Sequence, residues 1–395
     1  MVDKFKLDLT DIPKELKLIF KLLKSDSPAQ LVIQNPELIT NIDWEQFVDL
    51  TMHHRVYPVL SPKLKLMDDD IIPQYVKEFL YKQYQRNTFQ MLYLSGEMER
   101  VGRTFAHDEI PLIFLKGPVL AYELYGDISL RTSSDLDMLI PINQLEKADT
   151  LLAEQGYQKD NYIKTVLNDW KWRHHHVTYF HPQKKIKLEV HWRLNPGPGK
   201  EPSFKEMWQR KCISKLTSFP VNVLGKEDMF LFLVSHGARH GWSRMRWLVD
   251  IRELLHQHMD WQLTKRLLKK YQLYQTGGQA LILVEQLLDT KLTRGMKALT
   301  NHTCPKELAQ KALFYYKQQV NLHTEPVPEA VANYHKHYLF SLMSTQQRLI
   351  FIMSFLYPYP EDQSTLPLPK AVHFLYFPLR PFLWAWRKTR KHALP

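Results

Sequence analysis

Two aspartates, Asp135 and Asp137, lie one residue apart in the segment "RTSSDLDMLI". Strand residues alternate between two faces, so both carboxylates point to one side if a strand begins here. Carboxylates held a few ångströms apart repel each other unless a cation or a proton lies between them. Oxygen ligands of this kind suit Mg²⁺ or Mn²⁺, so the pair predicts a metal site, although the Ser/Asp-rich segment in isolation also fits a turn.

A third acid, Glu189, lies in the alternating run "KLEVHWRL". Leu188 and Val190 would face one side of a strand there, and Glu189 the other. If this strand pairs beside the one that begins at Asp135, three carboxylates converge. Such a cluster can hold one or two metal ions for phosphoryl transfer.

The segment "FLKGPVLAYELYG" precedes the aspartates and predicts a strand, a turn at Gly117 and a helix. A turn that opens a helix offers free backbone N–H groups and the positive end of the helix dipole, and both bind phosphate. Lys116, Arg131 and Ser134 are close enough in sequence to add charged or hydroxyl contacts. These residues therefore predict a binding site for a nucleoside triphosphate.

The elements that position these residues form a compact α/β unit. Strands are predicted near 110–117 and 135–140, and a helix follows Pro118 and ends before Gly126. A second helix is predicted from Asn143, as N-cap, to Gly156, and the residues from 174 to 194 form a β-hairpin with a turn at 182–185. The flanks show helical periodicity. The predicted fold is α+β, with a helical region at 1–104, a core with a mixed sheet at 105–222 and a helical region at 223–395.

The motifs "FLKGPVLAYELYGDISLRTSSDLDMLI", "LEVHWRL" and "HGARHGWSRMRWLVDIRELL" resemble those of the polymerase-beta-type nucleotidyltransferase superfamily. More narrowly, they are similar to an uncharacterised bacterial nucleotidyltransferase family. The resemblance covers residues 103–256 approximately. It implies transfer of a nucleoside monophosphate from a nucleoside triphosphate to a hydroxyl acceptor, with release of pyrophosphate.

The resemblance also implies a role for each matching residue. Gly117 begins the triphosphate-binding turn and Ser134 assists it. Asp135 and Asp137 bind Mg²⁺ or Mn²⁺, and Glu189, as third metal ligand, helps to activate the acceptor hydroxyl. One departure is Pro118, which stands where the superfamily usually has Ser or Gly, so a hydroxyl or a flexible amide is missing. Lys116 and Arg131 are candidates to compensate.

Histidines near these motifs allow further interpretations. Alternation along a strand lets His174 and His176 share a face, but a dedicated zinc site is not favoured. His191 lies on the same face as Glu189 and is a candidate for a substrate contact. His236 and His240 share a helix face, where they either form a polar seam with Asp250 or contact a base or phosphate.

Composition adds broad limits. The chain has 395 residues, a net charge of +12 and only two cysteines, Cys212 and Cys304, which favours a reducing, cytoplasmic compartment. No signal peptide is expected from the first residues, and no apolar run is long enough to span a bilayer. The mild basicity favours an anionic ligand such as a nucleotide. Nucleic acid is a further candidate partner, but no RNA-binding module motif is present.

From residue 371 to the end, the chain contains six aromatic residues and five Lys/Arg but no acid. Such a tail can lie in a membrane interface, with aromatic rings at headgroup level and basic residues near anionic lipid. It can also pack its aromatic residues on the body of the protein, and packing is the expected outcome. Peripheral membrane association is the alternative.

Two other functions are open. A metal-dependent glycosyltransferase also uses an Asp-x-Asp motif to bind a nucleotide sugar, but there an apolar strand precedes the acids, whereas here "RTSS" precedes and "MLI" follows. A non-catalytic nucleotide-binding protein of the same fold is the second alternative, and Pro118 is the feature that suggests it.

Overall fold

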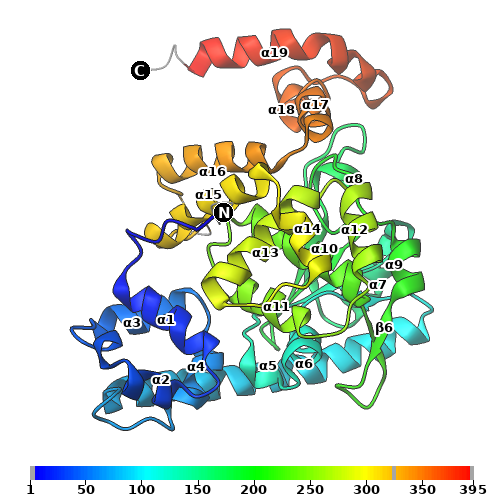
Figure 1. Cartoon of the computed structure of the whole chain (residues 1–395). Coiled ribbons are helices and arrows are strands. Elements are labelled where there is room, and N and C mark those ends of the chain that lie inside the picture. Colours follow the sequence, from blue (N-terminus) through cyan, green and yellow to red (C-terminus); the bar gives the residue numbers. More distant parts are fainter. Residues whose placement is uncertain (1–4, 323–325, 392–395) are drawn as a thin grey trace.

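The computed structural model describes residues 5–322 and 326–391, and its centre is a seven-stranded mixed sheet (Figure 1). The strand order is β3-β4-β5-β2-β1-β7-β6. β2–β5 and β1–β7 are parallel pairs, and the other neighbours are antiparallel. The strands are β1 (Ile113–Phe114), β2 (Asp135–Leu139), β3 (Gln158–Lys159), β4 (His176–His181), β5 (Ile186–His191), β6 (Cys212–Ser214) and β7 (Val221–Val223). The predicted α+β fold, with a mixed sheet and helical flanks, is confirmed.

Alternation along β2 separates an apolar face from a polar one. Leu136 and Met138 are buried in a cluster that packs the sheet against helices α5 (Gln74–His107) and α7 (Leu145–Glu154). Asp135 and Asp137 therefore face the other side, toward the C-terminal helices. β4 and β5 form the predicted hairpin, and β5 lies beside β2 as the convergence of the three acids requires.

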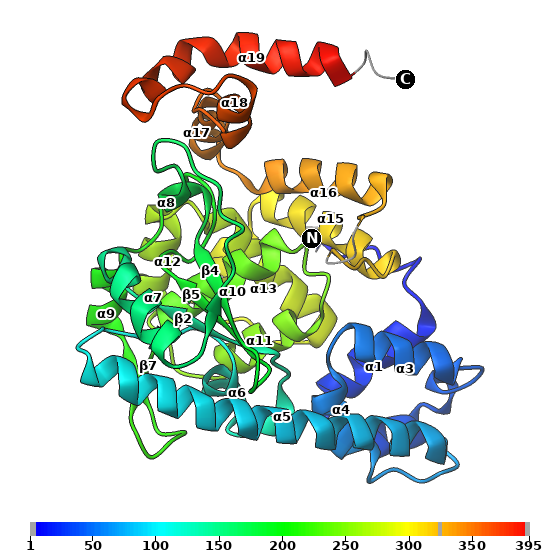
Figure 2. The ribbon, with the colours of Figure 1, turned by 180° about the vertical axis from the view of Figure 1, so that it is seen from behind.

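The N-terminal helices lie at one end of the molecule, and the long helix α5 connects them to the sheet. Figure 2 shows α5 running along the lower edge from this group to the strands. Its second half packs on the sheet through Met91, Met98 and Phe105, so the predicted boundary at residue 104 falls within one continuous helix. The other helices of the group are α1 (Lys14–Lys24), α2 (Pro28–Gln34), α3 (Trp44–His53) and α4 (Tyr57–Leu64).

Short helices connect the strands. α6 (Pro118–Tyr125) begins at Pro118 and ends at Gly126, whose φ of 70° is left-handed, as predicted. The predicted start of α7 at Asn143 is wrong, because a 3₁₀ turn over Ile142–Gln144 precedes the helix and Gln144 is its N-cap. The remaining short helices are α8 (Trp170–Arg173) and α9 (Phe204–Arg210).

The C-terminal helices cover the polar face of the sheet. α10 (Lys226–Arg239) and α11 (Arg246–Leu255) are separated by a turn at 240–245, and they pack on α13 (Tyr274–Leu288). Residues of α1, α3 and α4 join the same apolar core. The helices that complete this layer are α12 (Trp261–Lys270), α14 (Arg294–Thr300), α15 (Thr303–Lys317) and α16 (Glu329–Leu342).

The last three helices, α17 (Thr345–Ser354), α18 (Pro360–Thr365) and α19 (Tyr376–Lys391), stand at one end of the molecule (Figure 1). The expectation that the tail packs its aromatic residues on the body is wrong. Tyr376 is buried, but Phe382 and Trp384 are 73% and 54% exposed, and Phe374, Phe377 and Trp386 are also exposed. α19 rests mainly on α18 and on the 3₁₀ turn before it, so too little surface is available to cover these rings. No helix among the described residues is long and apolar enough to cross a membrane.

Candidate active site

The register between β2 and β5 brings the predicted acids together. Asp137 lies directly opposite Glu189, and Asp135 lies opposite Lys187. Asp137 is only 1% exposed, whereas Asp135 and Glu189 are partly exposed toward a cavity. All three carboxylates therefore line one wall, as expected if the two strands are neighbours.

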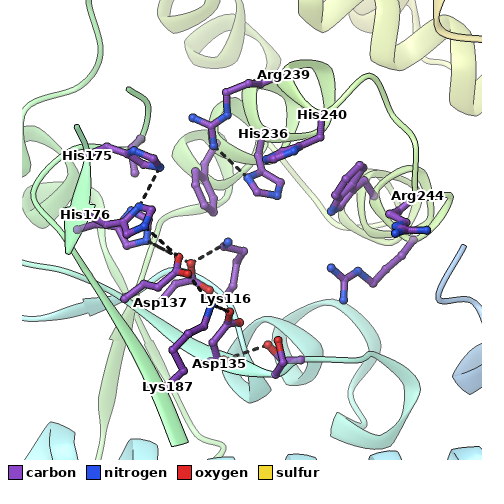
Figure 3. A pocket seen from close by; sticks show the side chains of 18 of the residues that line it. Lys116, Asp135, Asp137, His175, His176, Lys187, His236, Arg239, His240 and Arg244 are labelled. Carbon is purple, nitrogen blue, oxygen red and sulfur yellow. Dashed lines mark hydrogen bonds and ion pairs between the residues drawn. The ribbon is translucent and has the colours of Figure 1, made fainter. Parts of the chain in front are cut away.

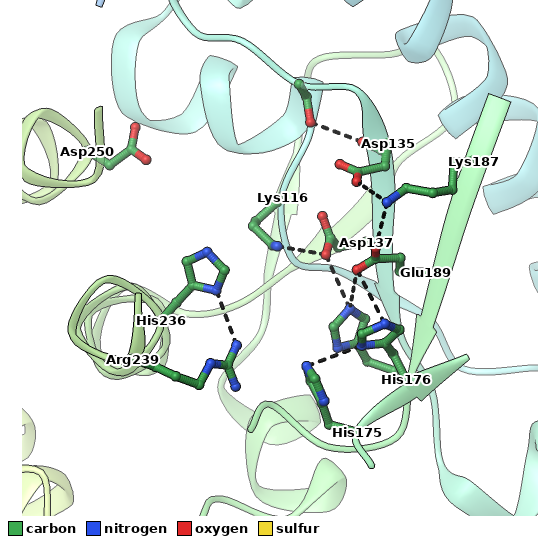
Figure 4. Close-up of polar contacts among 12 residues, drawn as sticks. Lys116, Asp135, Asp137, His175, His176, Lys187, Glu189, His236, Arg239 and Asp250 are labelled. Carbon is green, nitrogen blue, oxygen red and sulfur yellow. Dashed lines mark hydrogen bonds and ion pairs between the residues drawn. The ribbon is translucent and has the colours of Figure 1, made fainter. Parts of the chain in front are cut away.

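Two lysines neutralise this acidic wall. Lys116 Nζ lies 2.7 Å from Asp137 Oδ1, and Lys187 Nζ lies 2.9 Å from Asp135 Oδ2 and 2.8 Å from Glu189 Oε1 (Figure 4). Burial by itself would raise the pKa of Asp137, but the charge of Lys116 and the hydrogen bond with His191 outweigh it and lower that pKa. The pKa of Glu189 is likewise lowered against the effect of burial, by His191, His176 and Lys187. Both acids are therefore ionised at neutral pH.

Three imidazoles lie beside the acids. His191 Nε2 lies 3.2 Å from Asp137 Oδ1, and His175 Nε2 lies 3.2 Å from His176 Nδ1. Strand alternation does not apply to His174, because β4 begins only at His176, and the chain before the strand brings His175 to the cavity. Burial lowers the pKa of His176 to about 4 and that of His175 further, so both rings are neutral at pH 7.

The turn between β1 and α6 requires glycine at position 117. Gly117 has a φ of 86°, and a Cβ there would meet the Leu136 side chain at 3.2 Å. Pro118 is the first residue of α6 and lacks an N–H group, so this helix start has one donor fewer. The turn directs Lys116 into the cavity, as predicted for a residue near the phosphates.

Arg131 and Ser134 both line the cavity, in different settings. Ser134 is exposed, which suits a ligand contact. Arg131 is buried, and its Nε and Nη2 donate to both oxygens of Asp250, at 3.0 and 3.1 Å. Tyr125 donates a further hydrogen bond to Asp250, so the guanidinium of Arg131 braces the loop before β2 against α11.

The opposite wall is basic, and sequence reasoning missed most of it. Arg239, Arg244 and Arg246 come from α10, α11 and the turn between them, and Arg55 comes from the turn between α3 and α4. Burial lowers the pKa of Arg246 to about 9 and those of Arg239 and Arg244 to about 10. Within residues 5–322 and 326–391, no ion pair joins these four arginines to a carboxylate.

Arg244 is buried and the other three arginines are half-buried. Guanidinium groups in such positions without an anionic partner among the described residues are costly, and such a wall indicates a site for an anion. The motif "HGARHGWSRMR" contains three of the four arginines. Its density of basic residues is the feature of the sequence from which the basic wall could have been predicted. His236 and His240 line the same wall, although Asp250 is turned to Arg131 (Figures 3 and 4). The rings of His236 and His240 lie 4.7 Å apart, and Asp250 joins α11 to the core through Arg131 and Tyr125. Burial holds the pKa of His236 well below its usual range.

The two walls enclose a cavity of about 450 Å³, which falls within the size range of small-ligand pockets (Figure 3). A second cavity of about 470 Å³ borders it and shares Leu194, Pro196 and Arg239. Its remaining lining is largely apolar and includes Trp172, Leu342 and Phe351. The charged pocket thus adjoins an apolar one.

Carboxylates on adjacent strands, facing unpaired arginines across a cavity, are typical of enzymes that handle nucleotides and other phosphates. The chain belongs to an uncharacterised nucleotidyltransferase family, whose profile matches residues 40–289. The match supports transferase activity and a nucleotide substrate. It includes Arg55 and extends from α3 to α13, beyond the predicted 103–256. No curated protein matches this sequence.

Proposed function

We propose that this protein transfers a nucleoside monophosphate from a nucleoside triphosphate to a hydroxyl acceptor in a metal-dependent reaction that releases pyrophosphate. The observation that carries the proposal is the cavity with opposed walls. Its acidic wall suits divalent cations, and its basic wall suits the phosphates that such cations accompany. The resemblance to the polymerase-beta-like superfamily agrees with this arrangement.

Asp135, Asp137 and Glu189 are the proposed ligands for Mg²⁺ or Mn²⁺. The donor set fits, since Asp137 Oδ2 is buried without a hydrogen-bond partner among the described residues and oxygens of Asp137 and Glu189 approach each other. A bound dication would neutralise the phosphates and favour ionisation of the acceptor hydroxyl. In this site Glu189 faces the cavity and is proposed, as third metal ligand, to help activate that hydroxyl.

Basic residues are the proposed phosphate ligands. Lys116, the turn at Gly117, Ser134 and the arginines of α10 and α11 line the pocket in positions to orient the triphosphate and to offset charge on the leaving pyrophosphate. His236 and His240 are proposed to contact the nucleotide, and His191 to position Asp137. The role proposed for Arg131 is indirect, because its ion pair with Asp250 fixes the loop that carries Ser134 and Asp135.

The glycosyltransferase alternative is not favoured, because Asp135 and Asp137 lie at the start of β2 and not at its end. A non-catalytic nucleotide-binding role remains the second candidate, favoured by Pro118 at the helix start and by lysines already paired with all three acids. We further propose a cytoplasmic location, with peripheral membrane contact through α17 and α19. We also propose that the chain divides into the three regions expected from the sequence, which are residues 1–104, 105–222 and 223–395.

Pyrophosphate release measured with each of the four nucleoside triphosphates, with and without Mg²⁺, tests the proposal. We expect metal-dependent release with at least one nucleotide and a loss of about 100-fold or more in Asp137→Asn, because a ligand to the metal loses its charge. Asp160→Asn is the matched control, since Asp160 is exposed and does not line the cavity. Nucleotide binding without release would favour the non-catalytic role. The proposal fails if no nucleotide binds, or if Asp137→Asn behaves as the control does.

A further inference from the structure

The two oxygens of Glu189 face different partners. Oε1 lies 2.8 Å from Lys187 Nζ. Oε2 lies 3.7 Å from His191 Nε2 and 3.9 Å from His176 Nε2. Figure 4 shows Lys187 and His176 on opposite sides of this carboxylate. One side of Glu189 is therefore neutralised by a lysine, whereas the other faces two imidazole nitrogens.

The atoms on this second side have the spacing of a ligand set. His191 Nε2 also lies 3.2 Å from Asp137 Oδ1. An ion with bonds of about 2.0–2.2 Å to nitrogen and oxygen holds neighbouring ligand atoms roughly 3.0–3.6 Å apart. The distance from His191 Nε2 to Glu189 Oε2 lies close to this range, and a small rotation of the His176 ring would bring the distance from its Nε2 to the same oxygen into the range. Oxygens of Asp137 and Glu189 and one nitrogen of His191 all lie within 4.8 Å of one another.

We propose that Asp137, Glu189, His176 and His191 form a mixed nitrogen and oxygen site for a first-row transition-metal dication such as Mn²⁺, Co²⁺ or Zn²⁺, in preference to Mg²⁺. The inference rests on the proposed function, in that it names the kind of metal that the same carboxylates take. Imidazole is a poor ligand for Mg²⁺, which prefers oxygen and water, but it is a good ligand for transition metals. A purely oxygen-based Mg²⁺ site would make no use of the buried His191 and the partly exposed His176 beside its acids.

His175 supports the site from outside. Its Nε2 lies 3.2 Å from His176 Nδ1, so a His176 ring that binds metal through Nε2 can donate its Nδ1–H to His175. Such a hydrogen bond fixes the tautomer and the orientation of a metal-binding histidine. His175, His176 and His191 also bring nitrogens within 4.8 Å of one another. His175 is thus a positioning residue for His176.

One unused oxygen beside these atoms points to a missing ligand. Asp137 and His191 are 1% and 3% exposed. Asp137 Oδ2 has no hydrogen-bond partner among the residues that the structure describes; His191 Nδ1 has none either, but it is not the ring nitrogen that faces the acids. Buried polar atoms are normally satisfied, and both residues line the cavity. Asp137 therefore keeps one oxygen for an ion even while Lys116 holds the other.

Titration of the purified protein with Co²⁺, followed by visible absorption, tests the inference without any turnover. We expect Co²⁺ to bind at least about ten-fold more tightly than Mg²⁺, measured by competition, with a spectrum that indicates nitrogen ligation. His176→Ala and His191→Ala should each weaken Co²⁺ binding about ten-fold or more and change Mg²⁺ binding far less. His175→Ala should have a smaller effect in the same direction. His174→Ala is the matched control, because His174 packs near Tyr162 and does not line the cavity.

The inference is overturned if Co²⁺ binds no more tightly than Mg²⁺, or if His176→Ala binds Co²⁺ as the wild type does. His176 is the first residue of β4 and its side chain is partly exposed, so its variant decides the question even if His191→Ala does not fold. Failure of this inference differs from failure of the proposed function. Mg²⁺-dependent pyrophosphate release that both histidine variants retain would refute the transition-metal site alone. Histidine-dependent Co²⁺ binding without any pyrophosphate release would refute the transferase alone.

Discussion

At the scale of single residues, the charges that line the cavity are not balanced in the absence of a ligand. The three acids are offset by Lys116 and Lys187, whereas Arg239 and Arg246 on the facing wall have no anion. Burying a cation without a partner costs stability, so these arginines raise the free energy of the ligand-free protein. In the proposed function the triphosphate supplies the missing charge, so its binding would relieve this cost.

The variant Arg239→Gln tests two effects of this arginine separately: its cost to the stability of the ligand-free protein and its contribution to nucleotide binding. The guanidinium of Arg239 lies 3.4 Å from Nδ1 of the His236 ring, and its Nη1 is buried without a hydrogen-bond partner among the described residues. We expect the variant to bind nucleoside triphosphate about ten-fold more weakly, since a charge-assisted hydrogen bond is lost. We also expect the melting temperature without ligand to stay the same or to rise. Calorimetric titration and thermal unfolding measure the two effects.

Arg266→Gln is the control for this prediction, because Arg266 is exposed on α12 and lies outside the cavity. It should leave nucleotide affinity unchanged. A large loss of stability in Arg239→Gln, with unaltered affinity for nucleotide, would contradict the view that the basic wall is built for an anion.

At the scale of elements, periodicity explains which parts of the site were predictable. The acids of β2 and β5 were found from sequence because a period of two puts Asp135 and Asp137 on one face. The arginine wall was not found, because Arg55 and Arg246 are far apart in sequence and meet only when the α3–α4 turn packs near α11. The orientation of His175 depends on the chain just before β4, where strand alternation does not apply.

One buried carboxylate links three elements beneath the sheet. Glu97 of α5 accepts hydrogen bonds from Tyr157, at 2.6 Å, and from Lys184 of the β4–β5 turn, at 2.8 Å, and it pairs with Arg100. Burial by itself would raise the pKa of Glu97, but these three donors outweigh it and lower the pKa to about 2. The hairpin that carries Glu189 is thereby tied to α5.

The lowered pKa of Glu97 gives a pH dependence with a definite sign. A folded-state pKa of about 2, below the value of 4.5 for an unperturbed Glu, stabilises the fold above pH 4.5, and this contribution is lost as the pH falls from about 4.5 to about 2. We expect Glu97→Gln to reduce the free energy of unfolding by about 2 kcal/mol at pH 7, and by less at pH 3. Urea unfolding at both pH values measures this. Glu146→Gln, at an exposed position of α7, is the control and should change the free energy of unfolding at neither pH. An equal loss at both pH values in Glu97→Gln would contradict the view that the ionised form of Glu97 stabilises the fold.

At the scale of the whole molecule, the helices α17 and α19 have a different surface from the rest of the chain. Most apolar residues from α1 to α16 are buried in hydrophobic clusters, whereas α17 and α19 leave most of theirs exposed. The exposed set on these two helices is Leu349, Ile352, Met353, Phe377, Phe382, Trp384 and Trp386. A concentration of apolar side chains this large on a protein surface usually marks an interaction site.

Five basic residues and no acid follow residue 370, so an anionic membrane surface complements this end of the chain. We expect the protein to sediment with vesicles that contain anionic phosphatidylglycerol, more than with neutral phosphatidylcholine vesicles, and less at high salt because screening weakens the attraction. The double variant Phe382→Ser and Trp384→Ser should lose this binding, since both side chains are more than half exposed on α19. Phe89→Ser is the matched control, because Phe89 is 73% exposed on α5, as Phe382 is on α19. Sedimentation that is absent in the wild type, or equal in both variants, would show that the exposed rings of α19 have another partner.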